Sequence, residues 1–420
     1  MLTASQQNRY GWYVVLISAM IGVSMTASFP QFTMVVEEYA KQVNSTKEFL
    51  LFTDSVKSVS IMISMLLSGP IYQKLGLRRT FTLAILAMVI PQIIFPFLTN
   101  GTAVLILKII QGICAVVFPV FIITIMGWIS KESVGTATAV FNGIFYGGSG
   151  LGATAAGYTI AALGWKESFY MIAALTIIPS AIWFFTVKQK GEAIEDEALD
   201  AGGLNPSVGD ENVFASVVRS YKTWLLVICL FSTIWMVQVL SVDLPLYGSF
   251  YNYSAESTGL IMSSLSFGIF FACVVSGRIS DSFAKRSKHP AGARLKVFAF
   301  GPLLTIIAIL VLLIINKNNF TMFYSAILVL SFSGAWGLGS FYCILPELMS
   351  RKSVEYATGF IGGIADVGMP VGPFVFGVVF GIQGMWTAAW FSCIAICAIS
   401  LLGATLLMRN MAKPQAVITP

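Results

Sequence analysis

Residues Lys131–Gly157 read KESVGTATAVFNGIFYGGSGLGATAAG, and residues Arg351–Gly377 read RKSVEYATGFIGGIADVGMPVGPFVFG. When the two stretches are set side by side without a gap, at a constant offset of 220, nine of the 27 positions are identical. The identical pairs are Ser133/Ser353, Val134/Val354, Ala137/Ala357, Thr138/Thr358, Gly143/Gly363, Ile144/Ile364, Gly148/Gly368, Gly152/Gly372 and Gly157/Gly377. A second echo is Ser68-Gly69, which recurs as Ser276-Gly277. The two halves of the chain are therefore expected to be related.

The composition indicates a membrane protein. Of 420 residues, 57% are hydrophobic and 10% are charged, whereas soluble proteins carry about 25% charged residues. This excludes a soluble enzyme, a disordered protein and a secreted disulfide scaffold. A transmembrane helix needs about 20 apolar residues. Twelve apolar segments run approximately over 11–36, 49–72, 80–99, 102–128, 133–163, 167–187, 223–248, 256–279, 296–316, 320–345, 353–381 and 384–408.

The repeat pairs the fifth of these segments with the eleventh, as duplication of six helices predicts. The expected fold is an all-α membrane protein with twelve transmembrane helices in two pseudo-symmetric six-helix bundles. We expect the N-terminal bundle over 1–187, a cytoplasmic linker over 188–222 and the C-terminal bundle over 223–420. The linker is acidic and interrupted by glycine and proline, which is typical of flexible linkers; a regulatory site is the alternative. Two parallel six-helix repeats are an architecture of secondary transporters, with the substrate site near the midplane between them.

The distribution of lysine and arginine predicts the orientation. With the N-terminus inside, 19 basic residues fall on the inner side and four fall outside. The inner ones are Arg9, Lys74, Arg78, Arg79, Lys131, Lys188, Lys190, Arg219, Lys222, Arg278, Lys285, Arg286, Lys288, Arg294, Lys296, Arg351, Lys352, Arg409 and Lys413; the outer ones are Lys41, Lys47, Lys166 and Lys317. Because cytoplasmic loops are enriched in basic residues, both termini are expected to be cytoplasmic, in a plasma or bacterial inner membrane.

Residue types that catalysis or metal binding would need are scarce. The chain has one histidine, His289, in an expected loop, and its six cysteines lie in apolar stretches. Cys393 and Cys397 lie four residues apart without a nearby third ligand, so we interpret them as packing residues. No phosphate-binding Gly-x-x-x-x-Gly-Lys-Ser/Thr loop and no repeated selectivity element occur. We therefore expect no enzyme, no metal site and no cofactor.

The loop Gly69–Arg79, GPIYQKLGLRR, resembles the cytoplasmic loop motif of the major facilitator superfamily. The matching residues are Gly69, Lys74, Gly76, Arg78 and Arg79, whereas Gln73 replaces the usual acid. The second-half loop keeps Gly277, Asp281, Lys285 and Arg286 but has Ala284 for the second glycine. The stretch Lys108–Gly112 resembles the fourth-span motif with lysine for arginine, and Gly164-Trp165-Lys166 resembles the turn before span six. The resemblance covers essentially the whole chain and implies a major facilitator fold. It also implies that the two loops latch the cytoplasmic side in one state.

Within this family, the chain looks most similar to bacterial monocarboxylate and oxalate:formate porters, in Tyr10–Val15 and Leu75–Arg79. It departs from them at the charged residues of oxalate:formate exchange, an arginine in span eight and a lysine in span eleven. Span eight has no charge before Arg278, and span eleven has Asp366. Unlike drug:proton antiporters, the chain has Gly148 rather than proline after Gly147.

Charges within spans are costly and therefore mark candidate functional residues. Asp366 lies about 20 Å into span eleven, at 1.5 Å per residue. It is interpreted either as a proton acceptor or substrate contact, or as half of a fixed ion pair. Lys57 lies in span two, three residues after Asp54. Either it pairs locally with Asp54, or it faces Asp366, because spans two and eleven meet between the halves in this family.

Further candidates are polar or amphipathic residues on the expected cavity helices. Asp243, before Pro245, is either a cavity residue or an outer cap. Lys108 is expected to be a structural or coupling charge rather than a direct ligand. The remaining candidates are Gln111, Asn142, Tyr146, Gln238 and Trp336, and each of these alone is more often a packing residue than a ligand.

The expected function is secondary active transport by alternating access. Asp366 and Asp243 favour proton coupling, and Lys57 and Lys108 favour a small organic anion such as a monocarboxylate. The alternatives are proton-coupled efflux of amphipathic or cationic compounds and, outside transport, a non-transporting membrane receptor. The expected partners are a small-molecule substrate, protons and the lipid bilayer, with no nucleic acid, and the chain is expected to be a monomer.

Overall fold

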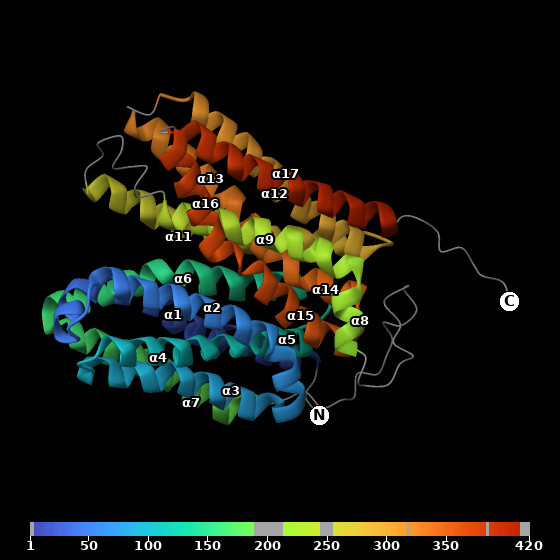
Figure 1. Ribbon diagram of the computed structural model, residues 1–420. Coiled ribbons are helices and arrows are strands. Elements are labelled where there is room, and N and C mark those ends of the chain that lie inside the picture. Colours follow the sequence, from blue (N-terminus) through green and yellow to red (C-terminus); the bar gives the residue numbers. More distant parts are fainter. Residues whose placement is uncertain (1–3, 189–212, 244–254, 317–318, 384–385, 412–420) are drawn as a thin grey trace. The chain divides into compact units, whose positions relative to one another are not determined.

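The computed structural model describes residues 4–188, 213–243, 255–316, 319–383 and 386–411 (Figure 1). Throughout these ranges the chain is almost entirely helical. Its contacts divide it into two compact units, Met1–Ser130 with Val140–Lys190, and Lys131–Ala139 with Gly191–Pro420. Much of the expected linker lies outside the described residues, and its described end, Val213–Arg219, forms the short helix α8. The expected boundaries at 187 and 223 therefore stay predictions.

The N-terminal unit is a bundle of long helices, which lie side by side in Figure 1 from blue to green. In chain order they are α1 (Ala4–Gln42), α2 (Lys47–Leu66), α3 (Ser68–Ile94), η1 (Phe95–Phe97), α4 (Gly101–Gly112), η2 (Ile113–Val116), α5 (Val117–Trp128), α6 (Val134–Leu163) and α7 (Trp165–Thr186). Helix α1 packs on α7, and α2 packs on α4. These are the neighbours that bring the candidate residues of this unit together.

The C-terminal unit is a second bundle. Its helices are α8 (Val213–Arg219), α9 (Tyr221–Val242), α11 (Ala255–Lys285), α12 (Pro290–Ile314), α13 (Phe320–Phe341), η4 (Tyr342–Ile344), α14 (Leu345–Leu348), α15 (Arg351–Ala365), α16 (Gly368–Gln383) and α17 (Trp386–Met411). Helix α13 packs on α11 and α12, and α9 packs on α16 and α17. The first residues of α6, up to Ala139, group with this unit rather than with the rest of their helix.

The twelve expected apolar segments each coincide with a helix or a run of helices. Among the described residues, eleven such helices are long and apolar enough to cross a membrane. Helix α6, with 30 residues, occupies the fifth expected segment. Large apolar side chains are exposed on the outer faces, among them Ile314 at 84% and Phe185 at 78%. A helix that is apolar on all sides needs lipid or other helices around it, so this exposure fits a bilayer.

Short polar side chains begin several helices. The side chain of Thr46 accepts a hydrogen bond from the Phe49 amide, and Asn100 accepts one from Thr102. Asn319 and Ser350 do the same at α13 and α15. Such caps satisfy amides that have no partner within the helix. They mark the residues at which the turns between helices end and these helices begin.

The reversal between the second and third spans falls in the expected gap between 72 and 80, although the helix also breaks at Leu67, which was not expected. We expected apolar segments over 49–72 and 80–99, but α2 ends at Leu66 and helix resumes at Ser68. The real turn is at Gly76, with φ 74° and ψ 176° inside α3. A positive φ favours glycine, because a side chain would clash there. The glycine of the loop motif therefore makes the reversal, while the residues before it stay helical.

The tenth and eleventh spans are interrupted. Span ten changes from α13 to the 3-10 turn η4 at Tyr342, and span eleven stops at Ala365 and resumes at Gly368. At the second break, the Met369 amide bonds to the Asp366 carbonyl at 2.9 Å, which is a tighter turn than an α-helix makes. Pro370 and Pro373 follow and supply no amide hydrogen. The expected single helix over 353–381 is therefore two helices joined at Asp366.

Candidate functional site

Lys57 is buried inside the N-terminal unit. Its side chain is 1% exposed, and its ammonium lies 3.2 Å from the Ser28 hydroxyl and 3.6 Å from the centre of the Phe29 ring. Both partners come from α1. A hydroxyl and an aromatic face stabilise a cation without neutralising it. Among the residues that the structure describes, no carboxylate forms an ion pair with Lys57.

The expected local pair between Asp54 and Lys57 is wrong. The Asp54 carboxylate instead pairs with Lys108 of α4, at 2.6 Å from the Lys108 ammonium. Lys108 is 1% exposed, whereas Asp54 is 18% exposed. Spacing along one helix placed Asp54 beside Lys57, but a lysine from the neighbouring helix α4 reaches the carboxylate directly. Lys108 is thus paired with a carboxylate inside the N-terminal unit, and its expected role as a structural or coupling charge stays a prediction.

The second lysine also lies on an aromatic face of α1. Its ammonium is 3.1 Å from the centre of the Phe32 ring and 5.6 Å from that of Phe95. The Phe32 ring belongs to a buried cluster with Tyr39, whose hydroxyl donates to the Phe95 carbonyl at 2.8 Å. These contacts pack the part of the α1 face that lies under Lys108.

Sequence reasoning missed Ser28, which contacts Lys57, and a second buried polar group that links α1 to α3 and α7. The Gln31 amide donates to the Ser168 hydroxyl at 3.0 Å, and Gln92 donates to the Gln31 oxygen at 3.5 Å. Ser28, Gln31 and Gln92 are all buried. Polar side chains within an apolar span were the available signal. Gln111, which was considered, lies 3.6 Å from the Met88 sulfur and is a packing residue of α4.

Asp366 is a buried charge of the C-terminal unit, as Lys57 is of the N-terminal unit. It caps the C-terminal end of α15 at the break in span eleven, and it is 5% exposed. Its Oδ1 atom has no hydrogen-bond partner, and Tyr342 of η4 lies within electrostatic reach. Next to it, a Cβ on Gly368 would lie 3.1 Å from the Phe231 carbonyl of α9. The two interrupted spans thus bring an unpaired carboxylate oxygen and a phenol into one region.

The expected fixed ion pair for Asp366 does not occur within its own unit, as far as the described residues go. Its expected approach to Lys57 joins the two units and stays a prediction.

Asp243 lies at the end of α9, where it is the C-terminal cap. It is 7% exposed, and its Oδ2 atom has no hydrogen-bond partner. Cys393 of α17 lies within its electrostatic reach. The residues after it, including Pro245, lie outside the described ranges. The geometry therefore fits the cap that one interpretation expected, with one oxygen still unused.

The remaining candidates are divided between the two units. Trp336 is buried and donates from its indole nitrogen to the Val297 carbonyl at 2.7 Å, so it fastens α13 to α12. Asn142 is buried on α6, and the half-buried Tyr146 packs edge-on against Phe118 and Phe145. Gln238 is half-buried on α9. Trp336 is thus a packing residue, and the roles of the other three stay predictions.

The first cytoplasmic-motif loop contacts α7. Arg78 donates to the Phe184 carbonyl at 2.6 Å, and its guanidinium lies 5.1 Å from the Phe184 ring centre. Lys74 and Arg79 are exposed, and Gly69 is buried. Arg78 therefore ties the turn at Gly76 to the end of the sixth span.

The second motif loop builds a buried polar network in the C-terminal unit. Asp281 accepts hydrogen bonds from the Gly135 amide at 2.9 Å and from the Thr136 amide and hydroxyl, both at 2.6 Å. Its Oδ1 atom also accepts from Arg294, at 2.9 Å. Gly277 allows the close approach, because a Cβ there would lie 2.6 Å from the Gly135 carbonyl. Lys285 and Arg286 are exposed.

Sequence reasoning missed Thr136 and Arg294 in this network. The Arg294 guanidinium also approaches Glu347 at 3.4 Å and the Cys343 sulfur at 3.3 Å. The carboxylate of Asp281, a residue of α11, thus lies at the N-terminal end of α6, where the helix dipole favours a negative charge.

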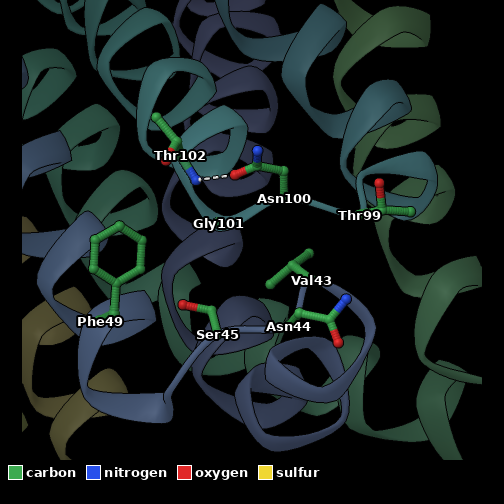
Figure 2. Close-up of a pocket in the computed structure, with 8 residues that line it drawn as sticks. All are labelled: Val43, Asn44, Ser45, Phe49, Thr99, Asn100, Gly101 and Thr102. Carbon is green, nitrogen blue, oxygen red and sulfur yellow. Dashed lines mark hydrogen bonds between the residues drawn. The ribbon is translucent and has the colours of Figure 1, made fainter.

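One pocket lies at an end of the N-terminal unit, between the turn that joins α1 to α2 and the turn that precedes α4. It has a volume of about 400 Å³ and is lined by Val43, Asn44, Ser45, Phe49, Thr99, Asn100, Gly101 and Thr102. Figure 2 shows the Asn100 side chain capping α4 at its wall. None of these residues is charged, and none was expected to bind substrate.

Residues 13–291, about two thirds of the chain, match the family model of the Major Facilitator Superfamily. The chain belongs to this superfamily. Its members are transport proteins rather than enzymes, and the loop motifs, the apolar spanning helices and the two helical bundles described above are those of a major facilitator.

Similar proteins agree with this membership. The probable galactarate/D-glucarate transporter GudP of Escherichia coli (strain K12) is 20% identical over 285 residues, which are 63% of this chain and 62% of that relative. This chain thus spans less than two thirds of the relative's length. The crystal structure of the human organic anion transporter MFSD10 (TETRAN) has a TM-score of 0.71 at 15% identity, covering 95% of this chain and 99% of that one. A variant of the E. coli fucose:proton symporter FucP has a TM-score of 0.69 at 12% identity, covering 96% and 98%. At these identities the structures show the fold alone.

Proposed function

We propose that this major facilitator transports a small organic anion, of the monocarboxylate kind, by alternating access and in exchange with or together with protons. The observation that supports it best is the buried Lys57 ammonium, which is held by Ser28 and Phe29 and has no carboxylate partner within the described residues. A buried cation without a counter-charge is expensive. A substrate carboxylate would supply that counter-charge.

The names of two similar proteins support an anionic substrate. One relative is a probable galactarate/D-glucarate transporter, and one protein of similar fold is an organic anion transporter. The resemblance of Tyr10–Val15 to monocarboxylate porters points the same way. The missing lysine of span eleven, replaced by Asp366, argues against copying the oxalate:formate mechanism as it stands.

The proposed coupling ion is the proton. Asp366 is buried at the break in span eleven with an unused Oδ1 atom, and an ionised carboxylate in such a place is costly. Binding of a proton removes the charge and that cost. Asp366 would thus release and rebind a proton as the site alternates between the two sides of the membrane.

A second candidate function is proton-coupled efflux of cationic or amphipathic compounds. The observation that favours it is the pair of buried acids in the C-terminal unit, Asp366 and Asp243, each with an oxygen that has no partner. Either carboxylate would attract a cation. This candidate requires that Lys57 be only a structural charge.

We further propose the setting in which this function operates. The chain would act as a monomer in a plasma or bacterial inner membrane. Both termini would lie in the cytoplasm, as the positive-inside rule predicts.

The deciding experiment is a thermal-shift screen on detergent-purified protein, followed by uptake into sealed proteoliposomes. The panel holds mono- and dicarboxylates, sugar acids, sugars, amino acids, amines and lipophilic cations. A ligand of the folded state must raise the apparent stability. We expect carboxylates to do so in the wild type and in Lys47→Gln, an exposed lysine of the same helix, but not in Lys57→Gln. We expect Asp366→Asn to keep the shift while uptake no longer responds to a proton gradient.

Other outcomes are decisive as well. If amines or lipophilic cations stabilise the protein and Asp366→Asn removes their effect, the anion proposal is wrong and efflux replaces it. Binding of carboxylates without any flux into vesicles would indicate a non-transporting receptor.

A further inference from the structure

Three ionisable side chains form one cluster inside the N-terminal unit. Lys57 and Asp54 lie three residues apart on α2, and Lys108 comes from α4 and pairs with Asp54 at 2.6 Å. Both ammoniums rest on phenyl rings of α1, Lys57 on Phe29 and Lys108 on Phe32. Residues three apart on a helix share a face, so the two ammoniums lie one after the other along the same side of α1. With all three groups ionised, the cluster holds one uncompensated positive charge.

The placement of that charge is asymmetric. Asp54 is committed to Lys108, whereas Lys57 has a hydroxyl and a ring as its partners. Both lysines are 1% exposed, so water screens them little. A first substrate carboxylate at Lys57 would bring the cluster to neutrality. A second carboxylate would meet Lys108 already paired and would add a negative charge to a neutral, buried site.

We propose that Asp54 is a specificity-determining residue, which restricts this site to substrates with one carboxylate by occupying the second lysine. The inference rests on the proposed function and deepens it, because it names the charge of the substrate. Asp54 is here a positioning residue for Lys108 and an internal substitute for the second carboxylate. The number of free ammoniums in the cluster then sets the number of carboxylates that the substrate can carry.

The test counts charges with four variants. Asp54→Asn releases Lys108, so that two ammoniums, Lys57 and Lys108, have no carboxylate partner. Asp54→Asn combined with Lys108→Met leaves Lys57 as the one free ammonium, and Asp54→Asn combined with Lys57→Met leaves Lys108. Lys57→Met alone leaves none. The probes are two size-matched pairs, butyrate with succinate and gluconate with glucarate, measured by thermal shift and by uptake into proteoliposomes. Lys47→Met, on the same helix outside the cluster, is the control.

The expected results follow the charge count rather than the identity of the lysine. The wild type, the control and both double variants prefer the monocarboxylate of each pair. Asp54→Asn raises the ratio of dicarboxylate to monocarboxylate binding by about tenfold or more. The reason is that the second substrate carboxylate can then pair with Lys108, and close buried charge pairs contribute at least that factor to affinity. Lys57→Met loses binding of both probes, and adding Asp54→Asn to it restores the monocarboxylate through Lys108.

Two results would overturn the inference. One is a folded Asp54→Asn variant with the wild-type ratio of mono- to dicarboxylate. The other is failure of Asp54→Asn to restore monocarboxylate binding to Lys57→Met. The second comparison, between Lys57→Met and its combination with Asp54→Asn, remains informative even if Asp54→Asn alone does not fold. Like the wild type, neither of these two variants has more than one unpaired ammonium. A wild type that responds to no carboxylate overturns the proposed function itself, whereas a wild type selective for monocarboxylates with unresponsive variants overturns only the role of Asp54.

Discussion

At the scale of single residues, the buried charges of the N-terminal unit show what a sequence can and cannot predict. The lysines were found because charges within apolar spans are rare. Their partners were not, because Asp54 is three residues from Lys57 but is bound by Lys108, which is 54 positions away. Spacing describes neighbours on one helix, whereas the shortest contact is set by how α2 packs on α4. Ser28 and Phe29 could not be predicted as partners of Lys57 either, since nothing in the sequence marks the face of α1 that meets α2.

Gly339 gives a prediction at the same scale. A Cβ on this residue of α13 would lie 2.6 Å from the Cys273 Cα atom of α11, and a backbone atom cannot move aside. Gly339→Ala should therefore lower the free energy of unfolding by about 1–3 kcal/mol through overpacking, despite the higher helix propensity of alanine. Thermal denaturation in detergent measures this.

The matched control for Gly339 is Gly127→Ala on α5, where a Cβ meets nothing within 4 Å. It should leave the melting temperature unchanged or raise it. Equal melting temperatures for the two variants would show that α11 and α13 are not in backbone contact.

At the scale of elements, the start of α6 depends on a residue of α11. Asp281 accepts three hydrogen bonds from the first turn of α6 and one from Arg294. The motif predicted a loop residue with a gating role, but it did not predict which helix the carboxylate would cap. The carboxylate reaches α6 because α11 and α6 approach each other closely at Gly277, and this contact cannot be read from the sequence.

Asp281→Asn tests this arrangement. Its amide keeps the size but loses the charge, so the more distant Glu347 is the one carboxylate left to pair with Arg294 among the described residues. Removing one partner of a buried ion pair costs about 3–5 kcal/mol, and we expect a loss of stability toward that range, measured by denaturation in detergent. Glu132→Gln, an exposed acid just before α6, should have no such effect. A wild-type melting curve for Asp281→Asn would contradict the capping role.

At the scale of the whole molecule, most of the fold followed from the sequence. Twelve apolar segments, a repeat with an offset of 220 and the loop motifs were enough to predict two six-helix bundles. The breaks in spans ten and eleven were not predicted, because Gly- and Pro-containing apolar stretches occur in continuous transmembrane helices too. The grouping of Lys131–Ala139 with the C-terminal unit was also beyond the sequence, since one helix ordinarily belongs to one bundle.

The orientation in the membrane gives a prediction at this scale. All six native cysteines are buried, so an introduced surface cysteine should dominate labelling by a membrane-impermeant maleimide. In intact cells, Lys166→Cys should react and Lys74→Cys should react only after permeabilisation, because the positive-inside rule places Lys74 in the cytoplasm. Both positions are exposed in the N-terminal unit. The reverse pattern would invert the proposed topology.

The break in span eleven has a spectroscopic consequence. In a regular helix the Met369 carbonyl would accept a hydrogen bond from the residue four positions later, but that residue is Pro373, which has no amide hydrogen. An isotope label on this carbonyl should therefore vibrate at a higher amide I frequency than a label in the middle of a helix without proline, such as α9. The frequency would fall whenever water or a ligand donates to the carbonyl. The Met369 carbonyl, three residues after the buried Asp366, thus provides an optical reporter of hydration near this carboxylate.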